Sequence, residues 1–115
     1  MNERKIIGLV VYVTIYSDNG KSIRIPAKVD TGASISSIDV ELASQLELGP
    51  LVKAKSIKSS LGHMKRPAVR ANIEIEGIKL NTIFTVADRA HLKYKVLIGK
   101  NTLKEGKFII DPLLG

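Results

Sequence analysis

The sequence predicts an all-β fold, a compact β-barrel or sandwich, in a single domain over residues 1–115. Apolar and polar residues alternate along several short runs, turn signals recur at roughly eight- to twelve-residue spacing, and helical periodicity is confined to short stretches. A chain of 115 residues is long enough for one modest core and too short for two. No internal repeat or interdomain linker is present.

An antiparallel hairpin is the first element that the pattern predicts. Apolar residues occupy every second position over 9–15 and again over 23–29. Between these runs lies Asn19-Gly20, a strong hairpin signal because both residues tolerate positive φ. We therefore expect one face of the hairpin in the core, with Pro26 placing part of the second strand at an edge or bulge.

The remaining elements follow in chain order. A short strand over 34–38 precedes a helix of one to two turns, which Asp39 caps and Gly49-Pro50 ends. The other expected elements are strands over 51–60, 67–76, 78–86, 96–98 and 108–110, a polar connection over 59–63, a turn at Glu76-Gly77, a loop over 88–95 and a helical turn from an Asn101 cap to Glu105.

The composition limits the compartment and the kind of site. Cysteine is absent, so the chain has no disulfide or thiolate site, which fits a reducing compartment. The apolar run from Ile6 to Val13 is too short to span a bilayer, and no small-residue cleavage site follows it. We therefore predict a cytoplasmic protein with no membrane partner.

The charge is strongly basic, with a formal net charge of +7. Such a balance favours an anionic partner, namely nucleic acid, an acidic lipid surface or an acidic peptide. Between Leu48 and Ile73 there is no acidic residue, and the alternative is that this stretch forms an ordinary solvated face. Its basic residues are Lys53, Lys55, Lys58, Lys65, Arg66 and Arg70.

The segment Ala27–Ile35 contains the main candidate for chemistry. Alternating apolar residues run into Asp30, and Thr31 and Gly32 follow at once. Glycine permits the tight turn that presents a carboxylate at the end of a strand, and the threonine hydroxyl can fix the loop. This arrangement suits acid/base catalysis, although an Asp-Thr-Gly string also occurs in ordinary β-turns.

Two segments resemble one protein family. Val29-Asp30-Thr31-Gly32-Ala33 is similar to the catalytic loop of retropepsin-like aspartic proteases, and residues 96–103 are similar to their later apolar-apolar-Gly segment. The resemblance covers most of the chain in element order. It implies a small closed β-barrel of the retropepsin (acid protease) type with one short C-terminal helix, in which Asp30, Thr31 and Gly32 form the catalytic loop.

A narrower resemblance is to small prokaryotic retropepsin-like proteins long labelled ATP-dependent zinc proteases, the RimB-type oligoglutamate peptidases. Ser34 departs from this group, which has Arg there, and Lys100 stands where both groups generally have Arg. A guanidinium fork and a lysine point charge are not equivalent in an ion-pair network. The segments that resemble this group are 66–69, 84–89, 94–99 and 108–112.

Hydrolysis of a peptide bond by carboxylates requires two of them. Two close carboxyl groups that share one proton supply both a base and an acid, because like charges a few Å apart cannot both ionise. The chain has one Asp-Thr-Gly, so we expect a homodimer in which Asp30 of each copy contributes. The resemblance agrees, and it implies that Thr31 pairs across the twofold axis while the terminal strands, over 108–110 and 5–8, interlock.

The expected substrate is a peptide or protein that lies beneath a flap around residues 59–64, although a loose hairpin is the alternative for this span. Because the basic cluster falls on the arms of the same hairpin, we expect a preference for acidic or glutamate-rich peptides, with Lys53, Lys58, Lys65, Arg66 and Arg70 as electrostatic candidates. The predicted substrate-binding residues are Ala33, Ser34, Ser60, Leu61, Gly62, His63, Lys65 and Arg66.

We expect neither a metal nor a cofactor. A catalytic zinc usually takes three protein ligands, and the chain has two histidines, His63 and His91, with no cysteine and no His-Glu-x-x-His string. A metal site formed by both histidines and an acid stays open. The alternative is that both are ordinary surface histidines. No phosphate-binding glycine loop supports ATP dependence.

Two other functions compete with proteolysis. A basic barrel that binds nucleic acid fits the charge, but five aromatic rings of Tyr and Phe and no Trp make a poor base-stacking surface. The other alternative is a non-catalytic module of the same fold that binds peptides or dimerises.

Overall fold

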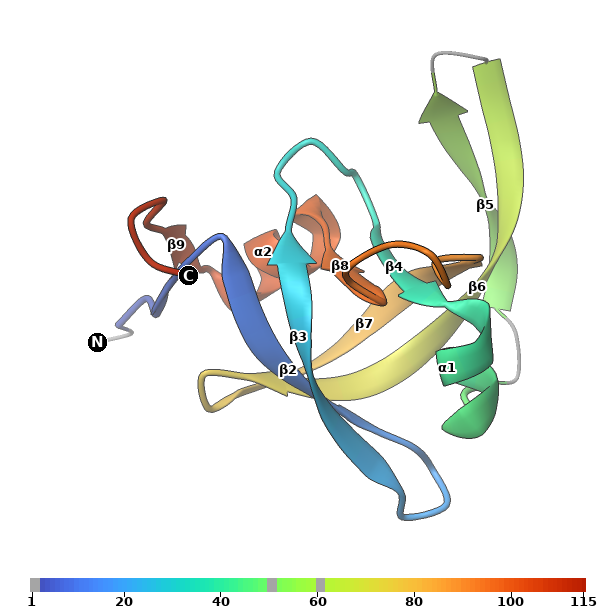
Figure 1. The fold of residues 1–115 in the computed structure, drawn as a ribbon, viewed down its shortest axis with the longest axis horizontal. Helices are drawn as coiled ribbons and strands as arrows, with labels where there is room; N and C mark the ends of the chain where they lie inside the picture. Colours follow the sequence, from blue (N-terminus) through green and yellow to red (C-terminus); the bar gives the residue numbers. More distant parts are fainter. Residues whose placement is uncertain (1–2, 50–51, 60–61) are drawn as a thin grey trace.

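The computed structural model describes residues 3–49, 52–59 and 62–115, with side chains described outside 50–65, and shows a closed barrel (Figure 1). Its strands follow the order β2-β3-β8-β4-β7-β6, and the barrel closes because β2 also pairs with β6. The barrel strands are β2 (Val10–Tyr16), β3 (Ser22–Val29), β4 (Ser36–Asp39), β6 (Gly62–Ile75), β7 (Ile78–Ala87) and β8 (Val96–Ile98).

The β2–β3 hairpin forms as the alternation predicts. Val13 pairs with Ile25 in antiparallel register, and Val11, Val13 and Ile15 all point into the core. The pairing of β3 with β8 begins only at Ala27, so Pro26 lies just before that contact and its missing N–H costs no bond there.

The strand pair β5 (Val52–Ser59) and β6 differs from the prediction in one respect. Strand β6 begins at Gly62, five positions before the predicted start at Pro67, because its first part pairs with β5 and its later part pairs with β7 from Ala68 onward. As a result the β5–β6 hairpin extends beyond the body of the barrel (Figure 1).

Branched aliphatic residues and one phenylalanine fill the barrel. Phe84, Ile38, Ile73 and Ile98 are fully buried. Each such side chain stabilises the fold by about 1.5–3 kcal/mol relative to an exposed position. Three buried hydroxyls, from Thr82, Thr85 and Thr102, lie beside this core and bear on the site described below.

Two short helices accompany the barrel. Helix α1 (Val40–Gln45) has the predicted cap, because Asp39 Oδ2 accepts a hydrogen bond from the N–H of Leu42 at 3.4 Å. Helix α2 (Lys100–Gly106) begins earlier than predicted, with Gly99 rather than Asn101 at its N-cap. Asn101 lies inside the helix, and its side chain forms hydrogen bonds to β4 and β7 instead of capping the helix.

The two chain termini meet in a separate small sheet. Strand β1 (Ile6–Ile7) pairs in parallel with β9 (Ile109–Ile110), so the segments over 5–8 and 108–110 lie side by side within one chain. None of the helices in the described part of the chain is long and apolar enough to cross a membrane.

Candidate active site

The Asp30 loop follows directly after β3. The N–H of Asp30 donates to the carbonyl of Ile98 at 2.9 Å, which places the loop at the end of two paired strands. Asp30 Oδ1 accepts the N–H of Gly32 at 2.8 Å, and the side chain is half-buried. This hydrogen bond sets the direction of the carboxylate, which stays partly accessible to solvent.

Gly99 forms the support beneath this loop. A Cβ at this position would lie 2.7 Å from the carbonyl carbon of Ile35 and 2.9 Å from the oxygen of Ala33, both of them backbone atoms that cannot rotate away. The close approach lets the N–H of Lys100 donate to Ala33 O at 2.8 Å. The start of α2 therefore holds the loop directly, and only glycine permits it.

A buried polar network joins the loop to the barrel. Asn101 Oδ1 accepts the N–H of Ser36 at 2.8 Å, and its Nδ2 donates to the carbonyl of Ile83 at 2.9 Å. Thr102 Oγ1 lies 2.6 Å from Ser36 Oγ and 2.8 Å from Thr82 Oγ1. The network fixes where the Asp30 loop enters β4, and the sequence did not reveal it because isolated Ser, Thr and Asn give no pattern.

Asp39 and Arg89 form a second support behind the site. Asp39 is buried, and its Oδ1 accepts the N–H of Arg89 at 2.8 Å. Burial raises the pKa of Asp39, but N–H groups of Arg89, Leu42 and Glu41, together with the Lys95 cation, outweigh it and hold the pKa below its ordinary value. The carboxylate therefore stays ionised and has a structural role.

The guanidinium of Arg89 is half-buried and faces three other charges. Its Nε donates to the carbonyl of Tyr94 at 3.0 Å, which fixes its position in the loop after β7. Burial lowers the pKa of Arg89, the charges of Asp39 and Asp30 oppose that shift, and Arg66 adds to it. Arg66 and Asp30 are thus both close enough to Arg89 for their charges to act on it.

Arg89 was not among the predicted site residues. The only signal that could have identified it was its place at the end of the family-like segment 84–89. Arg70, in contrast, does not join the site. Its guanidinium donates to Asn81 Oδ1 at 2.9 Å, and it lines another hollow with Tyr16 and Asp18, because β6 turns that side chain to a different part of the surface.

The other predicted site residues have the following places. Thr31, Gly32 and Ser34 are exposed in the loop, and Ala33 is half-buried. Arg66 is half-buried in β6, whereas Ser60 and Leu61 lie outside the described residues. Gly62, His63 and Lys65 belong to β6, where the backbone of Gly62 pairs with Ser59 and that of His63 with Lys58.

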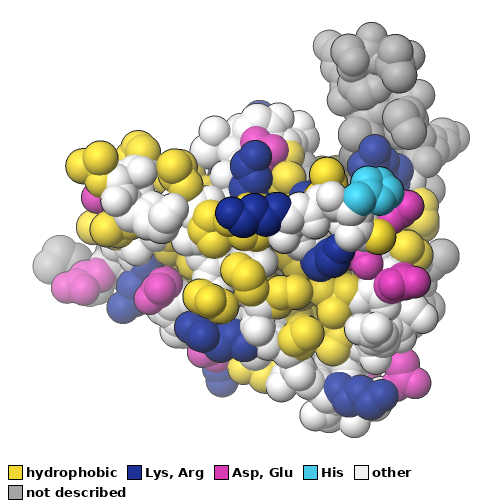
Figure 2. Space-filling model, in the orientation of Figure 1, with side chains coloured by type: hydrophobic (Ala, Val, Ile, Leu, Met, Phe, Trp, Pro, Cys, Tyr) yellow, Lys and Arg dark blue, Asp and Glu magenta, His cyan; other side chains and the backbone are white. Residues whose placement is uncertain are grey.

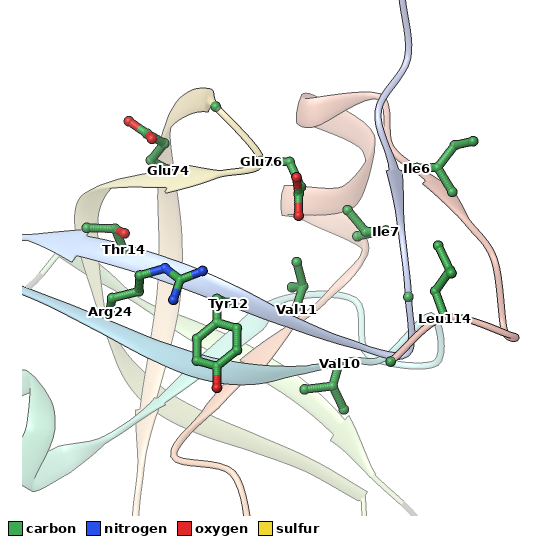
Figure 3. A pocket seen from close by; sticks show the side chains of 13 residues that line it. Ile6, Ile7, Val10, Val11, Tyr12, Thr14, Arg24, Glu74, Glu76 and Leu114 are labelled. Carbon is green, nitrogen blue, oxygen red and sulfur yellow. The ribbon is translucent and has the colours of Figure 1, made fainter.

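Two further hollows lie on the surface of the described residues. One of about 610 Å³ includes Thr31 in its lining and continues over α2 and the C-terminal segment. The other, of about 370 Å³, lies between β2 and the β6–β7 turn, where Arg24 stacks over the Tyr12 ring at 4.2 Å (Figure 3). No residue of the Asp30 loop lines this second hollow, so it is separate from the candidate active site.

Across the residues that the structure covers, no three His, Cys, Asp or Glu side chains lie together as a metal site. His91 is exposed in the loop after β7.

Comparison with protein families gives one match. The profile described as RimB-like, retropepsin-like aspartic endopeptidase RimB, matches residues 40–114. The matched part begins after the Asp30 loop and contains Arg66, Arg89, Gly99 and Asn101. No curated protein sequence matches the chain significantly.

Several solved structures share the fold. A Legionella pneumophila protein of unknown function has a TM-score of 0.70 at 18% identity, with 97% of this chain and 96% of that chain covered. EIAV protease in complex with an inhibitor has a TM-score of 0.67 at 19% identity, covering 96% and 95%. Simian foamy virus protease has a TM-score of 0.58 at 14% identity, covering 83% and 91%. The retropepsin-type closed barrel is thereby confirmed.

Proposed function

The chain belongs to the RimB-like family of retropepsin-like aspartic endopeptidases, and on this basis we propose that it hydrolyses peptide bonds as a homodimer. Asp30 of one copy activates a water molecule, while Asp30 of the other donates a proton to the substrate carbonyl. The two carboxyls exchange these roles when the tetrahedral intermediate collapses.

The observation that carries the proposal is the presentation of Asp30. Its N–H is bonded to β8, its Oδ1 is bonded to Gly32, and the loop rests on Gly99. These contacts fix a single half-buried carboxylate at the rim of the barrel. The buried Asp39 is occupied as a helix cap, so we assign the second catalytic acid to Asp30 of another copy.

Exposed apolar residues near the termini support such a dimer. Ile6, Leu9 and Ile109 are 55%, 45% and 42% exposed, and Leu113 and Leu114 follow them. Hydrophobic side chains gather over the part of the surface where the termini lie (Figure 2). Exposed apolar side chains gathered near the chain termini suit burial against a second copy.

We further propose that acidic peptides are the substrates and that the β5–β6 hairpin covers them. Arg66 at the base of the hairpin and Asp30 both lie close enough to Arg89, in the loop after β7, for their charges to act on its guanidinium. Paired guanidiniums of this kind bind carboxylates strongly. A hairpin that covers the bound substrate would exclude water from the reacting bond.

The test is to incubate the wild type and Asp30→Asn with oligoglutamate and with a mixed peptide library across pH, and to follow the products by mass. Asp88→Asn is the matched control, because Asp88 is exposed and its Oδ1 accepts only the nearby N–H of Ala90 at 3.0 Å among the described contacts. We expect products from the wild type and the control. Cleavage by Asp30→Asn at the wild-type rate would contradict the proposal.

A further inference from the structure

The hollow beside Thr31 has an unusual combination of charge and apolar surface. Four exposed cations line it, namely Arg4, Lys100, Lys104 and Lys107, over a floor formed by Leu103 and Phe108. We name these six residues the basic hollow. No acidic side chain of the described residues lines it, although Glu105 lies on the same helix.

Part of this cation set is held in place. Arg4 Nε donates to the carbonyl of Lys107 at 2.9 Å, and its Nη2 donates to the carbonyl of Phe108 at 3.2 Å. The N-terminal segment thus carries one guanidinium across the end of α2. Lys107 itself caps that helix in the left-handed region, with φ of 56°. The Arg4 guanidinium is therefore held at the end of α2, next to Lys107.

In the proposed dimer, the four cations of one copy lie close to the same four cations of the other copy. A twofold interface is formed by the same surface on both partners, so a cation near the axis meets the like charges of the other copy. Thr31 lines the hollow, it directly follows the Asp30 that the proposed dimer brings to the twofold axis, and the family resemblance implies that Thr31 pairs across that axis. The dimer would therefore place eight cations at one interface.

The electrostatic repulsion between the two copies across the dimer interface depends strongly on the ionic strength. The Debye length is ~30 Å at 0.01 M ionic strength and ~8 Å at 0.15 M, so the eight charges act on one another fully only in dilute salt. A multivalent anion can do more than screen, because it can contact cations of both copies at once.

We propose that the two basic hollows form an anion-binding site that exists only in the dimer, and that multivalent oxyanions drive assembly by occupying it. The site is built by residues of both copies and lies beside the catalytic loop. Anion binding therefore regulates the number of complete active sites. This inference rests on the proposed homodimer.

The test is sedimentation velocity of the full chain in sodium chloride and in sodium tripolyphosphate at equal ionic strength. Its readout is the dimer dissociation constant, which needs no substrate. We expect tripolyphosphate to lower that constant about tenfold more than chloride, because it neutralises cations of both copies. Equal effects of the two salts would contradict the anion site.

Two charge-reversal variants separate the basic hollow from the overall charge. Lys104→Glu with Lys107→Glu should dimerise tightly without tripolyphosphate and lose the response to it. The matched control, Lys21→Glu with Lys79→Glu, lowers the same net charge of +7 by the same amount at exposed positions outside the hollow. The control should keep the wild-type response, and a control that behaves like the hollow variant would overturn the inference.

Another result would contradict the proposed homodimer rather than the anion site. If the wild type and both variants stay monomeric at every anion concentration while the fold is intact by circular dichroism, the homodimer itself is wrong. A dimer that forms equally well in both salts contradicts only the anion site.

Discussion

The N–H of Arg89 donates to the buried carboxylate of Asp39 at 2.8 Å, so one side chain joins the cap of α1 to the loop after β7. That loop carries the Arg89 guanidinium, on which the charge of Asp30 also acts. The position of Arg89 therefore depends on an acid that has no place in the proposed chemistry.

Replacing Asp39 with Ala should destabilise the fold by about 1–3 kcal/mol, because it removes a helix cap and leaves the Arg89 N–H without its partner. The pKa of Asp39 is lowered in the folded state. The stabilising effect of Asp39 is therefore complete above the ordinary pKa of 3.8 and is lost as the pH falls through the pKa of the folded state. Urea unfolding of both proteins should show a constant difference above about pH 5, which narrows in stronger acid. A difference that widens in acid would contradict this account.

Gly99→Ala should disrupt the Asp30 loop more than it disrupts the barrel. The added Cβ would meet backbone atoms of Ala33 and Ile35 at 2.9 and 2.7 Å, so the loop has to move. We expect a loss of stability of about 1–3 kcal/mol, measured by thermal unfolding, and loss of proteolysis. Ser44→Ala, an exposed change on α1, is the control and should leave both properties unchanged. Full activity of Gly99→Ala would show that the close packing is not required.

Asn101 should tolerate no simple replacement. Asn101→Leu loses the bonds to the Ser36 N–H and the Ile83 carbonyl, and it should cost about 2 kcal/mol or more, because both backbone groups are left without a partner. Asn101→Asp keeps the acceptor and loses the donor, so its free energy of unfolding should lie between those of the wild type and Asn101→Leu. Equal values for the two variants would mean that the acceptor contributes nothing.

Ser37 should be replaceable without cost. Its Oγ is buried, and among the described residues it has no hydrogen-bond partner. Ser37→Ala removes this unsatisfied group and should raise the free energy of unfolding by up to about 1 kcal/mol. Denaturant unfolding checks this value, and a clear loss of stability would reveal a partner for the hydroxyl.

Arg66→Gln should weaken the binding of acidic substrates specifically. Removing one of the two guanidiniums, Arg66 and Arg89, should raise KM for a glutamate-rich peptide about tenfold and spare a neutral peptide. Arg70→Gln is the matched control, because it lies on the same strand but is bonded to Asn81 at another hollow. Steady-state kinetics with both peptides give the comparison, and equal effects of the two variants would remove the specificity role.

Periodicity and turn signals were sufficient to predict most of the fold. The alternation over 9–15 and 23–29, with Asn19-Gly20 between, predicted the β2–β3 hairpin, and Asp39 was correctly expected to cap α1. The early start of β6 was missed, because residues 62–66 carry no clear alternation and become a strand through pairing with β5.

For the candidate site, the sequence indicated only residues that are neighbours along the chain. The Asp30 loop is local in sequence, so a motif could reveal it. Its supports are not local: Ser36 and Asn101 are 65 positions apart, and Asp39 and Arg89 are 50 apart. Such contacts depend on the barrel closure, which a single sequence does not specify. Asn101 was read as a cap for this reason, although its partners lie on β4 and β7.

The most direct test of the shared active site is subunit mixing. Wild type at a fixed concentration, under conditions where the chain is dimeric, is combined with an equal amount of Asp30→Asn, and peptide hydrolysis is measured after exchange. If each active site needs Asp30 from both copies, mixed dimers are inactive and the rate should fall to about half, then fall further with excess variant. A rate that stays constant at every ratio would show that one chain acts alone and would contradict the account.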